Sequence, residues 1–540
     1  MKILIVIPAR GGSKGIPRKN LRLLNGKPLI YYSINTSLHS IFSPDVYVSS
    51  DDDEILLMAK NFGAKTFKRN QKNAEDHTTL DPVIYECFKF AEKKENKTYD
   101  LVVTLQPTSP LLKTSTLDQS LEYFKRNKKT TDTLISVKDN THLSWRKEGN
   151  NFIPNYIKRV NRQVLPKEYT ETGGFLISLS SNVEIDNRIG KKISLSILEN
   201  GEEIDIDNYI DWNICEYFLS KKKILFVVIG NKKVGLGHVY NTLIIANDIL
   251  NHSIEFLVDK DSELALQKIK TFNYPCYIQK SNNLIDDIRE REPNLIINDL
   301  LDTSVKYMEQ IKSLDVQVIN FEDLGPGSLI ADSVFNAIYP EKKEVKNHYY
   351  GQNYFILRDE FFYHKNEKKI EEVKEILITF GGVDPNNYTK KVLLSIYDYC
   401  KKNNILIHVI AGFGYQNYDS LDAFKDVLVH KNISNISEYM YRCDLIFTSA
   451  GRTIYEIASI GSPAIVMAQN KRETTHFFAT EKFGFLNLGI GTLISEAKIL
   501  DYFIELIHNK DKRIAMNEKM KKNKLKQGRK TVNKIIQNIL

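Results

Sequence analysis

A glycine-rich, basic stretch near the start of the chain has the residue types of an anion-binding loop. It reads "IPARGGSKGIPRKN" (7–20) and overlaps the end of the apolar run "KILIVIPA". Its glycines let the backbone approach a ligand closely, and its basic side chains supply positive charge. These residues are Gly11, Gly12, Gly15, Arg10, Lys14, Arg18 and Lys19. The stretch matches neither the Walker A pattern nor G-x-G-x-x-G. It therefore reads as a phosphate-binding loop or as a solvated basic turn.

Three further polar segments follow the loop along the chain. "SSDDDE" (49–54) and "LQPTSPL" (105–111) each come after an apolar strand, and the prolines of the second fix a rigid loop. That loop presents Gln106, Thr108 and Ser109. Because parallel strands bring their carboxyl ends to one edge of a sheet, these segments favour a ligand site over a basic turn.

The segment "EEIDIDNYID" (202–211) places Asp205 and Asp207 at alternate positions. In an extended chain, residues i and i+2 share a face, so both carboxylates can hold one hard divalent cation. The competing interpretation of this pair is an exposed edge strand.

Together these segments resemble the acylneuraminate cytidylyltransferases, the CMP-sialic or nonulosonic acid synthetases. "IPARGGSKGIPRKNL", "SSDDDEI", "LQPTSPL" and "IDID" stand in the order and spacing of that family over residues 1–218. The resemblance implies that CTP and a nonulosonic acid of sialic, legionaminic or pseudaminic type react to a CMP-sugar and pyrophosphate. It also implies a homodimer.

The resemblance assigns roles to individual residues. Lys19 and Arg10 would be catalytic, and Asp205 and Asp207 would bind Mg²⁺ as the cofactor. The triphosphate would be bound by Arg10, Gly11, Gly12, Ser13, Lys14, Lys19 and Asn20. The sugar side would include Arg69, Gln106, Thr108, Ser109, Arg162 and Gln163.

One segment departs from the family pattern. The family stretch "RQxLPxxaRxNGAIYI" reads "RQVLPKEYTETGGFLI" (162–177) here. Thr170 and Thr172 stand where the sialic acid enzymes have an arginine and an asparagine. Because a carboxylate without a bidentate arginine needs another partner, the sequence leaves the acceptor sugar open.

The remainder of the chain repeats the layout of a strand followed by a glycine turn. "KKKILFVVIG" runs into "NKKVGLGH", which places His238 at a helix start, and "KEILITFGGVD" begins at 374. "TSAGRTIYEIASIGSPAIVM" (448–467) has the same layout. A histidine at a helix start is often structural, but two such glycine turns downstream favour a diphosphate ligand.

This region, 221–540, resembles the UDP-sugar hydrolases of pseudaminic acid biosynthesis, relatives of the type-B glycosyltransferases. The matching pieces are "GLGH", "NFEDLG", "YFILRDEF", "FGGVDPNN" and "GRTIYEIASIGSPAI". The resemblance implies that His238 is catalytic between two lobes and that a UDP-sugar is bound. The nucleotide would contact Gly381, Gly382, Gly451, Thr453 and Glu456, with Asn470 closing the site.

Here too the pattern differs. The family's "GHxxRC" reads "GHVYNT", so Tyr240 and Asn241 replace an arginine and a cysteine, and "GGST" reads "AGRT", which introduces Arg452. An added arginine favours a phosphate ligand. The reaction stays open between hydrolysis, transfer to a sugar acceptor, and binding by a module without activity.

The spacing of apolar runs predicts the elements that position these residues. Short buried runs alternate with amphipathic helical segments, which is typical of parallel sheets covered on both faces. The fold class is therefore α/β, with unit boundaries near 220 and 370. The resemblances imply that 1–220 is a Rossmann-like, GT-A-like nucleotidyltransferase domain and that 221–370 and 371–540 are the two Rossmann-like lobes of a GT-B-like region. Its 540 residues are too many for one core.

Composition narrows the function class. The net charge of +8 is spread along the chain, and the densest cluster, "EKMKKNKLKQGRK" (518–530), is typical of a solvated helix; we expect no nucleic-acid partner. The five cysteines are widely separated, which excludes a Cys-x-x-Cys zinc site and fits a reducing compartment. No stretch reaches the ~18 apolar residues of a membrane span. The sequence thus predicts a cytoplasmic, bifunctional nucleotide-sugar enzyme.

Overall fold

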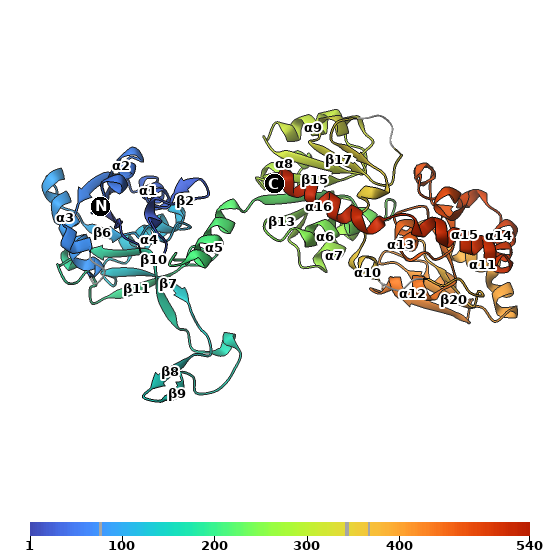
Figure 1. The fold of residues 1–540 in the computed structure, drawn as a ribbon, viewed down its shortest axis with the longest axis horizontal. Helices are drawn as coiled ribbons and strands as arrows, with labels where there is room; N and C mark the ends of the chain where they lie inside the picture. Colours follow the sequence, from blue (N-terminus) through green and yellow to red (C-terminus); the bar gives the residue numbers. More distant parts are fainter. Residues whose placement is uncertain (14, 75–77, 341–344, 365–367, 432) are drawn as a thin grey trace. The chain divides into compact units, whose positions relative to one another are not determined.

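Most of the apolar runs become strands of three large sheets (Figure 1). The structure is a computed structural model that describes the whole chain except residues 14, 75–77, 341–344, 365–367 and 432. The chain divides into two compact units, residues 1–221 and 222–540. Among the described residues, no helix is both long and apolar enough to cross a lipid bilayer.

The first unit is built on a seven-stranded sheet of order β11-β7-β10-β6-β1-β4-β5. Its strands and those of two small hairpins are β1 Ile3–Pro8, β2 Leu23–Leu24, β3 Lys27–Pro28, β4 Asp45–Ser50, β5 Lys65–Lys68, β6 Leu101–Thr104, β7 Thr133–Asp139, β8 Trp145–Glu148, β9 Asn151–Pro154, β10 Tyr169–Leu179 and β11 Ile193–Ile197. Its helices are α1 Leu29–Leu38, α2 Asp53–Asn61, α3 Leu80–Glu95, α4 Thr114–Arg126 and α5 Tyr209–Ser220.

The expectation of a purely parallel sheet is wrong for this unit. β10 pairs antiparallel with both β6 and β7. The reason is the connection: residues 140–168 form an arm with the β8–β9 hairpin instead of a crossover helix, so the chain returns in the opposite direction. In Figure 1 the β8–β9 hairpin projects away from the sheet of this unit.

The second unit contains two fully parallel sheets, as expected for two Rossmann-like lobes. Their orders are β14-β13-β12-β15-β16-β17-β18 and β21-β20-β19-β22-β23-β24. The strands are β12 Lys223–Val228, β13 Ser253–Val258, β14 Cys276–Ile278, β15 Leu295–Asp299, β16 Gln317–Phe321, β17 Ser333–Asn336, β18 His348–Tyr350, β19 Glu375–Ile378, β20 Leu406–Ala411, β21 Val427–Lys431, β22 Leu445–Thr448, β23 Ala464–Ala468 and β24 Phe485–Ile490. The helices are α6 Gly237–Asp248, α7 Glu263–Lys270, α8 Leu284–Arg289, α9 Val305–Lys312, α10 Asp359–Phe362, α11 Tyr388–Lys402, α12 Ile436–Arg442, α13 Thr453–Ile460, α14 Glu496–His508, α15 Lys510–Lys521 and α16 Gly528–Ile539.

The last helix returns to the first of these lobes. Val532 and Ile536 of α16 belong to the hydrophobic core that contains β12 and β13. Arg529 forms an ion pair with Asp248 at the end of α6. A division of the sequence at 370 places α16 in the last lobe, whereas its apolar face is buried in the preceding one. The two lobes are therefore joined at two places along the chain.

Candidate nucleotide-binding and catalytic sites

In the first unit, the glycine-rich loop begins where β1 ends and meets the ends of two neighbouring strands. The Gly11 amide donates to Asp51 Oδ1 at 3.2 Å. The same oxygen accepts from Arg69 Nη2 at 3.2 Å. Burial lowers the pKa of the Arg69 guanidinium, and the ion pair with Asp51 opposes that effect. Gly12 is exposed, Ser13 is half-buried, and Lys14 lies outside the described residues.

Lys19 lies against the acidic pair that the sequence singled out. Its Nζ donates to the Ile206 carbonyl at 2.6 Å, between Asp205 and Asp207 along the chain. Burial lowers the pKa of Lys19, while the charges of Asp207 and Asp205 act to raise it. The loop and this segment also touch at Gly15, where a Cβ atom would lie 2.4 Å from the Asp207 carbonyl oxygen. No side chain fits there, so glycine is needed at this contact.

Asn20 supports the same loop from within. Its Nδ2 donates to the Arg10 carbonyl at 2.9 Å, and the Asn20 side chain is buried. The backbone turn that presents Arg10 is thus held in place by a side chain ten positions later. The structure brings together Arg10, Gly11, Lys19 and Asn20, and it adds Asp51 from the "SSDDDE" segment.

Buried polar atoms without partners mark the other side of this site. Among the described residues, Asp205 Oδ1 and Ser109 Oγ have no hydrogen-bond partner. They lie together, because a Cβ atom at Gly173 would be 2.9 Å from each of them. Burial raises the pKa of the Asp205 carboxyl. A buried carboxylate oxygen without a partner is costly unless a ligand or cation pairs with it, so this donor set fits Mg²⁺.

The remaining sugar-side residues are placed differently. The backbone N–H of Gln106 donates to the Gly173 carbonyl at 3.2 Å, and the backbone N–H of Ile206 donates to the Thr108 carbonyl at 2.8 Å. The "QPTSP" loop therefore borders the site. Arg162 and Gln163 lie in a short 3-10 helix and are exposed. Within the described chain neither forms a hydrogen bond or ion pair with the loop residues.

The segment that departs from the family pattern is part of β10. Thr172 Oγ1 is 2.8 Å from Ser136 Oγ on β7, so its hydroxyl is used inside the sheet. Thr170 is exposed and is paired with Lys138 in the same ladder. Neither side chain takes the place of the missing arginine.

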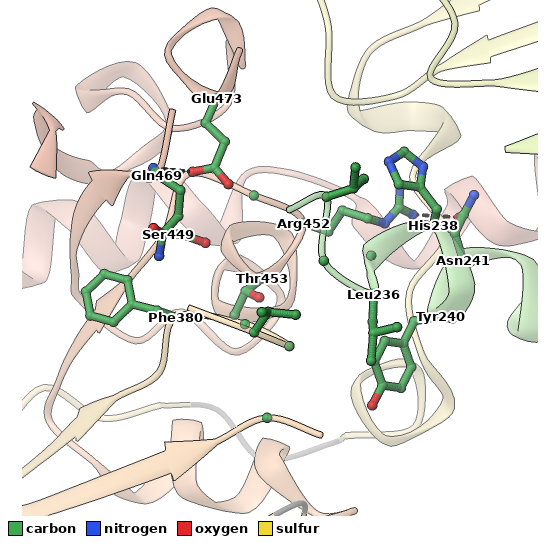
Figure 2. Close-up of a pocket in the computed structure, with 18 of the residues that line it drawn as sticks. Leu236, His238, Tyr240, Asn241, Phe380, Ser449, Arg452, Thr453, Gln469 and Glu473 are labelled. Carbon is green, nitrogen blue, oxygen red and sulfur yellow. Dashed lines mark hydrogen bonds between the residues drawn. The ribbon is translucent and has the colours of Figure 1, made fainter. Parts of the chain in front are cut away.

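The second unit has a cleft of about 420 Å³ whose walls come from both lobes. That volume lies in the usual range for small-molecule sites. Its lining includes His238 and the glycine turns after β19 and β22 (Figure 2). Gly381 has φ of +79°, which favours glycine, and a Cβ at Gly412 would lie 2.4 Å from the Gly381 carbonyl oxygen.

His238 is the first side chain of α6 and forms a pair with Asp299 at the end of β15. Its Nδ1 is 2.5 Å from Asp299 Oδ1, and the Asp299 side chain is fully buried. A carboxylate only accepts, so Nδ1 carries a proton, and in the neutral ring Nε2 keeps a lone pair. Asn241 Nδ2 donates to the other Asp299 oxygen at 2.8 Å. This arrangement gives a positioned base of the kind used in proton transfer.

Arg452 reaches this group from the opposite lobe. It precedes α13, and its Nη2 donates to Asn241 Oδ1 at 2.7 Å, as Figure 2 shows. Its Nη1 donates to Glu322 Oε1 at 3.1 Å, and its guanidinium carbon lies 4.5 Å from the centre of the Phe355 ring. The two departures from the family pattern, Asn241 and Arg452, are therefore direct partners. Tyr240, the other changed position, is half-buried and also lines the cleft, and burial raises the pKa of its hydroxyl.

The other predicted residues of the cleft have mixed placements. Thr453 begins α13, and Gly382, Gly451 and Asn470 line the cleft. Both carboxylate oxygens of Glu456 accept from Arg358, at 2.6 and 3.0 Å. Glu456 is thus held by an internal ion pair, and a ligand would have to compete with Arg358 for it.

Several residues of the cleft were not identified in the sequence. Asp299, Glu322, Arg472, Glu473 and His476 all line the cleft or contact its residues. Asp299 and Glu322 stand at or directly after the ends of apolar strands, which is the signal that could have identified them. Burial raises the pKa of Glu473 to about 7 and lowers that of His476 to about 4.

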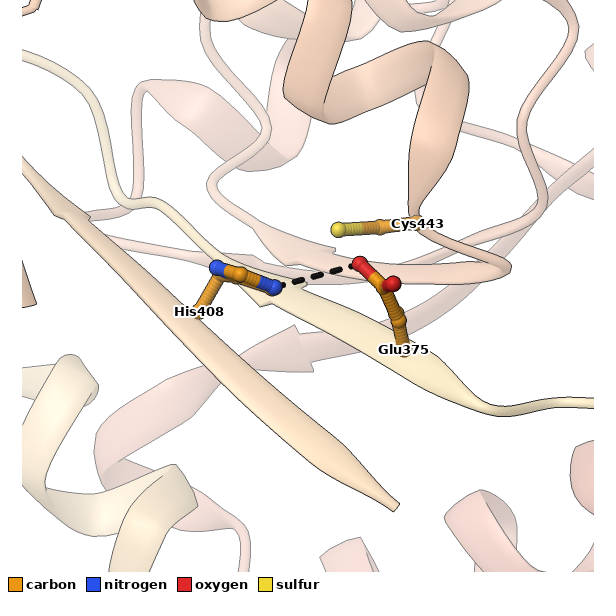
Figure 3. A group of neighbouring side chains, drawn as sticks. All are labelled: Glu375, His408 and Cys443. Atoms are coloured by element: carbon orange, nitrogen blue, oxygen red, sulfur yellow. Dashed lines mark hydrogen bonds and ion pairs between the residues drawn. The ribbon is translucent and has the colours of Figure 1, made fainter. Parts of the chain in front are cut away.

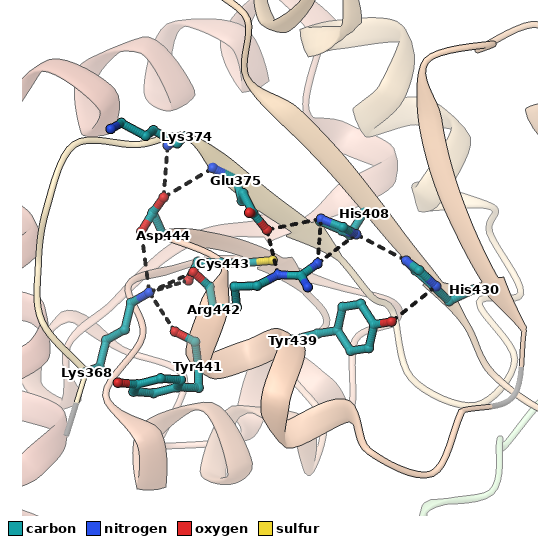
Figure 4. Close-up of polar contacts among 10 residues, drawn as sticks. All are labelled: Lys368, Lys374, Glu375, His408, His430, Tyr439, Tyr441, Arg442, Cys443 and Asp444. Atoms are coloured by element: carbon teal, nitrogen blue, oxygen red, sulfur yellow. Dashed lines mark hydrogen bonds and ion pairs between the residues drawn. The ribbon is translucent and has the colours of Figure 1, made fainter. Parts of the chain in front are cut away.

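A second group of metal-ligating residue types lies at the start of β19, β20 and β22. Ligand atoms of Glu375, His408 and Cys443 lie within 4.8 Å of one another (Figure 3). Arg442 donates to Glu375 Oε2 at 2.7 Å and to His408 Nε2 at 2.9 Å. Its guanidinium supplies the positive charge that a metal would bring. We interpret the group as a structural network, which continues through His430 (Figure 4).

Comparisons with known proteins bear mainly on the first unit. Residues 4–208 match the family model described as Cytidylyltransferase. Over 218 residues the chain is 34% identical to pseudaminic acid cytidylyltransferase of Campylobacter jejuni, covering 39% of this chain and 93% of that protein. Over 225 residues it is 33% identical to CMP-N,N'-diacetyllegionaminic acid synthase of Legionella pneumophila, covering 40% of this chain and 95% of that protein.

Two other similarities complete the comparison. The chain is 32% identical over 273 residues to the uncharacterized protein MJ1062 of Methanocaldococcus jannaschii, covering 46% of this chain and 56% of that protein. It thus spans about half the length of that curated relative. Among solved structures, MurG of Acinetobacter baumannii aligns with 59% of this chain and 99% of its own, at 15% identity and a TM-score of 0.42.

Proposed function

Because this chain belongs to the cytidylyltransferase family through residues 4–208, we propose that its first unit transfers CMP from CTP to a nonulosonic acid. The anomeric hydroxyl oxygen attacks the α-phosphorus, the bond from that phosphorus to the bridging oxygen breaks, and pyrophosphate leaves. The hydroxyl proton is released to solvent or to a nearby base. The relatives named for pseudaminic and legionaminic acids support this substrate class.

The observation that carries this proposal is the position of Lys19 against Asp205 and Asp207. A lysine there stabilises negative charge that develops on the transferring phosphate, and Arg10 holds the rest of the triphosphate. Asp205 and Asp207 would hold Mg²⁺, which neutralises phosphate charge when bound. Catalysis is then positioning and charge neutralisation by groups that do not themselves change covalently.

Pyrophosphate release from CTP tests this activity. The purified chain is supplied with CTP, Mg²⁺ and, in turn, pseudaminic, legionaminic and N-acetylneuraminic acids. We expect release with at least one of these acids and none when the acid is omitted. Release that proceeds equally well without any acid, or no release with any of the three, contradicts the proposal.

For the second unit we propose hydrolysis of a UDP-linked amino sugar in the cleft. The His238–Asp299 pair supports it, because Nε2 of an imidazole held by a buried carboxylate can take a proton from water. The same base could serve transfer to a sugar acceptor, and an inactive module would keep only binding. UDP release without an acceptor supports hydrolysis, acceptor-dependent release supports transfer, and binding without turnover supports the module.

We also propose that the first unit forms a homodimer through its arm and edge strand. Trp145, Phe152 and Ile157 of the arm region are exposed, and so are Ile193, Leu195 and Ile197 along one face of β11. Apolar side chains gathered in this way mark an interaction surface. Light scattering should give twice the chain mass, and Leu195→Glu should reduce it to that of one chain. A monomeric wild-type protein rules out the dimer.

A further inference from the structure

Glu322 is a buried carboxylate that faces the cleft of the second unit. It follows β16, its side chain is 2% exposed, and it lines the cleft wall. Its φ of +53° lies in the left-handed region, which is unfavourable for glutamate. Strained backbone of this kind persists where the surroundings impose it, and it clusters at ligand sites. The conformation therefore indicates that the direction of this side chain matters.

Only one oxygen of Glu322 has a side-chain partner. Oε1 accepts from Arg452 Nη1 at 3.1 Å, whereas Oε2 is buried and has no partner among the described residues. Burial raises the pKa of this carboxyl to about 7, although the charge of Arg452 acts to lower it. A buried acceptor without a partner costs free energy that a bound ligand group can recover.

Arg452 supplies a hydrogen-bond donor beside that acceptor. Its contacts with Glu322 and Asn241 use one hydrogen on each terminal nitrogen, and each of these nitrogens carries two. The Phe355 ring beneath the guanidinium and the two partners fix its plane. The cleft wall therefore presents an acceptor and a rigid donor side by side.

This pairing selects one kind of ligand group. A phosphate offers only acceptors and would be repelled by the carboxylate. A secondary amide points its N–H and C=O in opposite directions. It therefore cannot form hydrogen bonds through both groups with two neighbouring residues of one wall. A hydroxyl donates and accepts through the same oxygen atom. A sugar hydroxyl therefore matches both Glu322 and Arg452.

We propose that Glu322 and Arg452 form a specificity subsite for a hydroxyl group on the sugar part of a nucleotide sugar. Glu322 Oε2 accepts the hydroxyl hydrogen, and an N–H of Arg452 donates to the same hydroxyl oxygen. The inference rests on the proposed binding of a UDP-sugar in this cleft. It adds the residues that recognise the sugar and the functional group of the sugar that they contact.

Calorimetric titrations of the full chain with UDP, UDP-glucose and UDP-N-acetylglucosamine test the subsite. We expect Glu322→Gln and Glu322→Ala to bind UDP within twofold of wild type and to bind the better UDP-sugar at least about tenfold more weakly. Glu309→Gln, the same change on an exposed site of the same lobe, should alter neither affinity. Thermal unfolding of each variant verifies that the fold is retained.

Monodeoxy analogues of the bound UDP-sugar identify the hydroxyl. Removing the hydroxyl that meets Glu322 should weaken binding to wild type more than binding to Glu322→Ala, because the variant has already lost one of the two hydrogen bonds that this hydroxyl makes. Failure of UDP and both UDP-sugars to bind overturns the proposed function of the cleft. Binding of a UDP-sugar that the Glu322 variants leave unchanged, or binding no tighter than that of UDP, overturns the subsite alone.

Discussion

Arg452 Nη2 and Asn241 Oδ1 are 2.7 Å apart and join the two lobes of the second unit. This bond also orients the Asn241 amide, since an oxygen that accepts from Arg452 leaves Nδ2 to donate to Asp299. Asp299 in turn holds His238. The two residues that depart from the family pattern thus act together on the base of the cleft.

Replacing Arg452 and Asn241 separately and together should give non-additive losses of stability. We expect the loss in free energy of unfolding of Arg452→Ala,Asn241→Ala to be about 1 kcal/mol smaller than the sum of the two single losses, because both single variants remove the same bond. Urea unfolding followed by fluorescence measures it. Strictly additive losses would show that the bond contributes nothing.

Asp299→Asn should impair any proton transfer by His238 while leaving the cleft in place. An amide can donate to Nδ1, so it no longer enforces the tautomer with a free Nε2 lone pair. We expect UDP release to fall ~100-fold or more with UDP binding within a few-fold of wild type. Asp315→Asn, an exposed aspartate of the same lobe, is the control. Unchanged turnover in Asp299→Asn would exclude His238 as the base.

Asp207→Asn should abolish pyrophosphate release by the first unit and preserve its fold. The exposed carboxylate contributes charge beside Lys19 that an amide cannot supply. Titration with Mg²⁺ should not restore release in the concentration range that saturates wild type. Asp186→Asn, on an exposed loop of the same unit, should behave as wild type. Full activity in Asp207→Asn would remove this residue from the metal site.

His476 should make the second unit sensitive to acid. Burial lowers its folded-state pKa from 6.5 to about 4, and its Nδ1 donates to the Ala450 carbonyl at 2.7 Å. Between those values the unfolded chain binds a proton that the folded chain does not. The stabilisation is therefore complete above pH 6.5 and is lost as the pH falls towards 4, by up to about 3 kcal/mol.

The variant His476→Asn isolates this contribution. An asparagine Nδ2 can donate to the same carbonyl but does not titrate. Buried Glu322 and Glu473, whose pKa values are raised to about 7, act in the opposite sense in both proteins, so the difference between wild type and variant reports His476. Chemical unfolding at several pH values measures the free energy of unfolding of both proteins. The difference between wild type and variant should change as the pH falls from 7 to 4. Parallel pH profiles would refute the assignment.

Local sequence patterns were sufficient to predict the α/β fold class and much of the site in the first unit. Apolar runs such as "KILIVIPA" and "KKKILFVVIG" specify buried strands, and a glycine turn after a strand places its residues at the ligand edge of the sheet. The loop at 7–20, Lys19 and the "IDID" segment are assigned to one site by the order and spacing that they share with the cytidylyltransferases. The structure brings Lys19 to that segment through a hydrogen bond across 187 positions.

What the sequence alone could not determine depends on contacts between distant residues. The antiparallel direction of β10 follows from an arm with no periodic pattern, and the return of α16 to the earlier lobe follows from which core accepts its apolar face. Glu322, Asp299 and Arg452 become one site only when the lobes face each other, because they are 23 to 153 positions apart along the chain. Local sequence patterns specify strands, turns and residue types, whereas the pairing of charges across the cleft is decided by the tertiary packing that brings the two lobes together.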